Sequence, residues 1–183
     1  DGADAIMLSA ESASGQYPIE AVTMMDRIAR HTQDDPTYHT GIALQHPDLQ
    51  HTAADAITAA AHQVADTINA AAIVTYTTSG STTLRAARER PSVPILCLTS
   101  KLQTARRLVL SFGVHAVQTS DVANFAEMVQ KAVQITERDG LAKIGQSVVI
   151  TAGVPFGKPG NTNVLRIAVI EEPHDPRQLK LVD

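Results

Sequence analysis

The strongest constraint on the fold is the regular alternation of helix and strand patterns between residues 52 and 170. Four segments with apolar residues at helical spacing alternate with short apolar runs that are typical of buried strands. The runs expected to form strands are 71–77, 94–99, 114–119, 146–153 and 164–170. This order predicts a parallel sheet with helices on both faces. Because only a short loop joins the last two runs, the final strand is expected to be antiparallel, at an edge of the sheet.

Four segments follow from this pattern. We expect residues 52–172 to form a three-layer αβα domain of the α/β class, with a mixed, mostly parallel five-stranded sheet. Residues 1–33 do not fit this unit, because a buried strand expected at 5–9 and the helix pattern after it look like the last βα pair of a larger fold. Residues 34–51 carry two Pro and one Gly without a clean period, which predicts a linker. Residues 173–183 are expected to form a polar tail.

Composition narrows the function classes. The 183 residues carry a net formal charge of −4, which argues against a general nucleic-acid surface. The longest apolar runs are about half a membrane span, so no transmembrane helix is expected. The N-terminal stretch lacks the features of a secretion signal, which makes the cytoplasm the expected location. The one cysteine, Cys97, is expected to be a buried hydrophobe, and the scattered His residues indicate no metal site.

The stretch "TTSGST" at 77–82 is the first candidate for a functional site. It lies between a predicted strand and a predicted helix, where α/β proteins bind ligands and where a helix start offers free N–H groups. Gly80 permits a close approach of the backbone, and five hydroxyl groups offer hydrogen bonds without adding charge. The hydroxyl residues are Thr77, Thr78, Ser79, Ser81 and Thr82. This pattern favours a phosphate ligand, and the alternative is a helix cap with solvated neighbours.

A second candidate is the Gly- and Pro-rich stretch "GVPFGKPGNTN" at 153–163, which connects two predicted strands. It has the length to fold over a ligand at the edge of the sheet, with Lys158 as a cation. The alternative is a long hairpin loop without a ligand.

The stretch "DGADAIMLSAESASGQYPIEAV" at 1–22 resembles pyruvate kinase at the end of its (β/α)8 barrel. The family pattern there is close to D-G-x-D-x-x-M-L-S-x-E-[ST]-A-x-G-x-Y-P-x-E-A-V. "TTSGST", "QTARRL" at 103–108 and "GVPFGKPGNTNVLRI" at 153–167 are similar to the family in order and spacing. The resemblance, to bacterial members of the family, implies that 1–33 are the last strand and helix of the catalytic TIM barrel. It implies that 52–172 are the allosteric C-terminal domain.

The resemblance also implies an activity. The family transfers phosphate from phosphoenolpyruvate to ADP with Mg²⁺ and K⁺, and is typically a homotetramer whose C-terminal domains contact one another. Its main catalytic and metal-binding residues would precede Asp1, so this chain is expected to be inactive without the rest of the barrel and to hold no metal. Ser9 and Glu11 alone would lie near the active-site mouth, where a purely structural role in the turn is the alternative.

The family's effector site implies roles for further residues. The hydroxyl-rich loop would hold an effector phosphate, with Lys158 and Gly160 in the effector loop and Phe125 as the aromatic residue at a second phosphate. The family's Arg at that second phosphate aligns with Ala132, and a methyl group cannot neutralise a phosphate. We therefore expect an effector with one phosphate, such as a sugar monophosphate or AMP. The alternatives are an assembly domain with an unused effector site, or a free-standing phosphosugar-binding domain.

Overall fold

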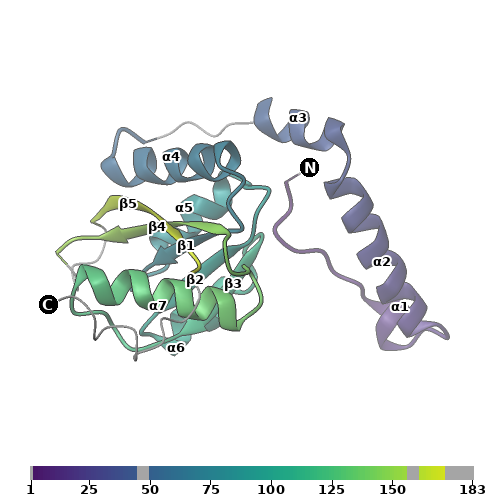
Figure 1. Cartoon of the computed structure of the whole chain (residues 1–183). Helices are drawn as coiled ribbons and strands as arrows, with labels where there is room; N and C mark the ends of the chain where they lie inside the picture. Colours follow the sequence, from purple (N-terminus) through teal and green to yellow (C-terminus); the bar gives the residue numbers. More distant parts are fainter. Residues whose placement is uncertain (1, 45–49, 156–160, 172–183) are drawn as a thin grey trace, which may run out of the picture. The chain divides into compact units, whose positions relative to one another are not determined.

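The computed structural model describes residues 2–44, 50–155 and 161–171 (Figure 1). The chain divides into two compact units, Asp1–Asp48 and Leu49–Asp183. Each unit is described by itself below.

The first unit contains three helices: α1 (Ala10–Ala13), α2 (Pro18–Gln33) and α3 (Pro36–Leu44). The helix predicted from Pro18 is confirmed, with the proline in the first turn, where its missing N–H costs nothing. The segment predicted to be a linker is helical in part, since it contains α3.

The strand predicted at 5–9 is not formed in the first unit. A strand needs a neighbouring strand to satisfy its N–H and C=O groups, and the described part of this unit contains none. Apolar side chains that would face a larger fold are exposed instead, with Met7 84% and Ile19 77% accessible. The apolar run thus forms no strand in the described part of this unit.

The second unit is built on one five-stranded sheet with the order β3-β2-β1-β4-β5. Its strands are β1 (Ala72–Tyr76), β2 (Ile95–Thr99), β3 (Val114–Gln118), β4 (Ser147–Gly153) and β5 (Thr162–Val169). β1 is parallel to β2 and β4, β2 is parallel to β3, and β5 is antiparallel to β4. The predicted fold class, including the antiparallel edge strand, is confirmed.

Four helices accompany the sheet: α4 (Ala53–Thr67), α5 (Ser81–Arg88), α6 (Leu102–Leu108) and α7 (Phe125–Arg138). Thr52 caps α4, because its hydroxyl accepts a hydrogen bond from the Asp55 N–H at 3.2 Å. Asn124 caps α7, because its side-chain oxygen accepts from the Glu127 N–H at 2.9 Å.

The core consists of two apolar layers on opposite faces of the sheet, and Figure 1 shows α4 and α7 on these two sides. Adjacent residues of β1 face opposite layers. Ile73 belongs to the layer of Ala61 and Ala65 of α4. Val74 belongs to the layer of Met128 of α7. Both strand residues are almost fully buried, as expected for a central parallel strand covered on both sides.

Cys97 in β2 is fully buried, as the sequence predicted. Burial raises the pKa of its thiol, and hydrogen bonds from Thr83 and Thr75 oppose that shift only in part. The cysteine is therefore a neutral packing residue of the sheet at physiological pH.

Candidate functional site

The hydroxyl-rich loop 77–82 follows β1 at the carboxyl end of a central strand, and its last two residues are the first two of α5. Gly80 precedes the first helical residue with φ +95°, a left-handed conformation that residues with a Cβ rarely adopt. A Cβ at Gly80 would lie 3.0 Å from Nη2 of Arg107 and 3.3 Å from the Leu108 side chain. Both the backbone conformation and the close approach of α6 thus require glycine in this turn.

Some donor and acceptor groups of the loop are hydrogen-bonded within the loop, and others are not. The Gly80 N–H donates to Oγ1 of Thr77 at 2.9 Å, and the Ser79 and Ser81 hydroxyls are 3.1 Å apart. Each hydroxyl can both donate and accept, so one contact does not exhaust it. The N–H groups of Thr82 and Thr83, in the first turn of α5, have no acceptor among the described residues. The loop therefore offers free donors at a helix start, as an anion requires.

The structure separates Thr82 from the exposed hydroxyls. Thr82 is buried, and its hydroxyl lies 2.6 Å from that of Thr162, the first residue of β5. The carbonyl of Thr78 accepts from the Thr104 hydroxyl of α6 at 3.1 Å. Thr82 and the Thr78 carbonyl thus anchor the loop to its neighbours. Ser79 is exposed, and Thr77, Thr78 and Ser81 are half-buried.

Arg107 of α6 is the residue that the sequence analysis missed. Its guanidinium donates to the Ser79 carbonyl and its side chain is exposed, so most of its donor groups are still available. Its hydrogen bond thus brings a cation to the loop. The signal was present in "QTARRL", which served only for the resemblance.

A buried ion network holds α5, the helix that carries the loop. Oδ1 of the fully buried Asp55 lies 2.7 Å from Nε of Arg85 and 3.4 Å from Nη2 of Arg88. Its other oxygen accepts from the Gln50 N–H at 2.6 Å. Burial by itself raises the pKa of Asp55, but the Gln50 N–H and the two guanidinium groups outweigh it and hold the pKa below its usual range. The network fixes α5 against the start of α4.

Ala132 does not lie at the site. It is fully buried in the layer between α7 and the sheet, so a side chain at this position could not reach a ligand at the surface. The structure thus shows a core residue of α7 at the position that the resemblance gave to a phosphate-binding arginine. Ala132 gives no information about the number of phosphates on an effector.

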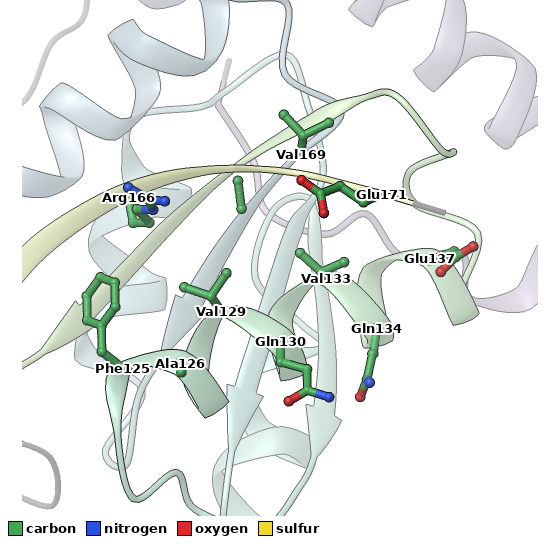
Figure 2. A pocket seen from close by; sticks show the side chains of 11 residues that line it. Phe125, Ala126, Val129, Gln130, Val133, Gln134, Glu137, Arg166, Val169 and Glu171 are labelled. Atoms are coloured by element: carbon green, nitrogen blue, oxygen red, sulfur yellow. The ribbon is translucent and has the colours of Figure 1, made fainter. Parts of the chain in front are cut away.

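The remaining predicted residues lie elsewhere. Lys158 and Gly160 are outside the described residues. Phe125 is the first residue of α7, and its side chain lines a groove between α7 and β5 (Figure 2). In the first unit, the Glu11 carboxylate accepts from the Ser9 N–H at 3.0 Å, and hydrogen bonds from the Glu11 and Ser9 N–H groups lower its pKa.

In the part of the chain that the structure describes, no group of three or more His, Cys, Asp or Glu side chains lies together as a metal site would require. Of the described helices, none is long and apolar enough to cross a membrane.

The mixed sheet defines the second unit as an α/β domain. Its candidate anion site is the glycine turn at the carboxyl end of β1, where N–H donors are free. The family model described as "Pyruvate kinase, alpha/beta domain" matches residues 55–168, and the chain belongs to this family.

The similarity to curated proteins extends over both units of the chain. A pyruvate kinase of Methylorubrum extorquens is 45% identical over 177 residues, which are 97% of this chain and 37% of that protein. One of Geobacillus stearothermophilus is 42% identical over 172 residues, 94% of this chain and 29% of that protein. One of Agrobacterium vitis is 41% identical over 167 residues, 91% of this chain and 35% of that protein. The chain thus spans roughly a third of the length of the curated relatives that it matches.

Proposed function

We propose that this chain is the C-terminal part of a pyruvate kinase, which transfers phosphate from phosphoenolpyruvate to ADP in glycolysis. The observation that carries the proposal is the similarity to pyruvate kinases over 97% of this chain but only 37% of the relative. Residues 1–33 would then be the last βα unit of the catalytic barrel, which explains the exposed apolar side chains of the first unit. The whole protein would be a cytoplasmic homotetramer.

The chain by itself is expected to be inactive. Mg²⁺ and K⁺ would serve the whole enzyme, through ligands outside this chain. Ser9 and Glu11 would contribute only to the surroundings of the active site. The test is a coupled assay of pyruvate formation with the chain alone and with the barrel supplied on a separate polypeptide. Turnover by the chain alone would refute this assignment.

We further propose that the loop 77–82 binds the phosphate of an allosteric effector. The free N–H groups of Thr82 and Thr83 support this, together with the exposed hydroxyls and the Arg107 guanidinium. Lys158 and Gly160 would complete the site from the loop that follows β4. One cation at the described loop suits one phosphate, so a sugar monophosphate or AMP is the proposed class. Phe125 is left out of this site because it faces the groove between α7 and β5.

Calorimetric titration with glucose 6-phosphate, AMP and fructose 1,6-bisphosphate tests the effector class. The monophosphates are expected to bind more tightly, and tighter binding of the bisphosphate would refute the class. Ser79→Glu places a negative charge at the exposed part of the loop and should abolish binding by repulsion. Thr67→Glu, on an exposed position of α4, is the matched control. No binding of any of these ligands would favour an assembly domain with an unused site.

A further inference from the structure

The groove between α7 and β5 has a volume of about 670 Å³ and does not belong to the proposed phosphate site. Figure 2 shows Phe125 and Arg166 at one end, and Glu137 and Glu171 at the other. Glu171 is also the last residue that the structure describes before residue 172. The chain therefore leaves the folded domain from one end of the groove.

The charged side chains at the two ends of the groove have no polar partner among the described residues. None of the side chains of Arg166, Glu137 and Glu171 forms an ion pair or hydrogen bond with another described residue. The wall between them is apolar, formed by Val129 and Val133 of α7. The groove thus fits an extended segment with a cation at the carboxylate end, apolar residues in the middle and an anion at the arginine end.

We propose that residues 172–183 of this chain, which lie outside the described residues, bind in this groove. Their sequence is "EPHDPRQLKLVD". The Pro173 to Pro176 stretch has the residues that favour a reversal of the chain. After a reversal the segment runs back along β5, from the carboxylates towards Arg166.

The order of residues in the segment matches the groove in that direction. Arg177 comes first and meets the carboxylate of Glu171, Leu179 and Leu181 follow at the apolar wall, and Asp183 comes last, towards Arg166. From Arg166 to Glu171 the strand extends about 17 Å, and an extended segment from Arg177 to Asp183 extends about 20 Å. Because the segment is tethered, its effective concentration is on the order of millimolar, so weak contacts suffice.

β5 is also the edge strand of the sheet. Such an edge invites pairing with another chain unless something covers it. The competing occupant is a second copy of this chain, and the experiment below separates the two.

The test compares the full chain with a chain that ends at Glu171, by NMR of the Val129 and Val133 methyl groups. We expect the shortened chain to show shifted methyl signals, and the peptide 172–183 added in trans to restore them. A peptide with Leu179→Ser and Leu181→Ser, which keeps every charge, is the control and should restore nothing. Identical methyl spectra of the two chains would overturn the proposal.

Two further measurements complete the test: exchange of the charges at residues 171 and 177, and sedimentation to determine the oligomeric state. Arg177→Glu should shift the methyl signals towards those of the shortened chain, and Glu171→Lys in the same chain should reverse most of that shift. If the two chains differ only because one of them sediments as a dimer, the groove is an interface between copies and the proposal fails. Phosphate binding at the loop 77–82 should be the same in both chains, so this outcome does not depend on the proposed function.

Discussion

Replacement of Asp55 by Asn should destabilise the second unit strongly. The amide keeps the size of the side chain and an oxygen for the Gln50 N–H, but it removes the charge that pairs with Arg85 and Arg88. Breaking a buried pair costs about 3–5 kcal/mol. The two arginine side chains are 26% and 28% exposed, so water relieves part of this cost. We expect a loss of about 2–3 kcal/mol in the free energy of unfolding.

Urea unfolding followed by circular dichroism measures this loss. With a slope of about 2 kcal/mol per M, the midpoint should fall by about 1–1.5 M. Asp66→Asn on the same helix is the control, because Asp66 pairs with His62 at the surface and should contribute less than about 1 kcal/mol. A loss at Asp55 no larger than at Asp66 would refute the reasoning.

The pH dependence gives a second measurement on the same variant. Because the folded protein holds the pKa of Asp55 below its ordinary value, the carboxylate stabilises the fold above that ordinary value, about 3.9. This stabilisation is lost as the pH falls through the folded-state pKa, where the protonated side chain resembles Asn. The difference between the two proteins should be constant from pH 7 to about 5 and shrink below about pH 4. A difference that persists undiminished in acid would contradict the electrostatic explanation.

Three further predictions concern the sheet and the loop. Gly80→Ala should lower the free energy of unfolding by about 1–2 kcal/mol, because φ is +95° and the new methyl group meets Arg107; an unchanged urea midpoint would contradict this. Thr162→Val removes the hydroxyl that Thr82 contacts and should cost about 1 kcal/mol in the same assay, whereas a more stable variant would show that the contact contributes nothing. Cys97 should react with a thiol reagent only when urea unfolds the chain, and rapid labelling of the native protein at pH 8 would show that the β2 cysteine is accessible.

The loop and the Asp55 network differ in how far the sequence predicted them. "TTSGST" was visible because short hydroxyl residues and glycine between a strand and a helix are typical of a turn and a helix start. The sequence pattern does not single out Asp55 as part of a network. Its partners Arg85 and Arg88 lie about thirty residues away along the chain, and only the packing of α4 on α5 brings them together. The contact of Arg107 with the loop was not predicted for the same reason, because Arg107 reaches the loop from α6.

By itself, the sequence determined the order of the elements, the sheet type and the place of the loop, because hydrophobic periodicity and turn chemistry act over a few neighbouring residues. The tertiary structure decided what each side chain faces. It buried Thr82 against Thr162 and Ala132 in the core, and it left the apolar run at 5–9 without a strand partner. Such outcomes depend on contacts between residues far apart in the chain. Local pattern specifies the elements, and only packing specifies their partners.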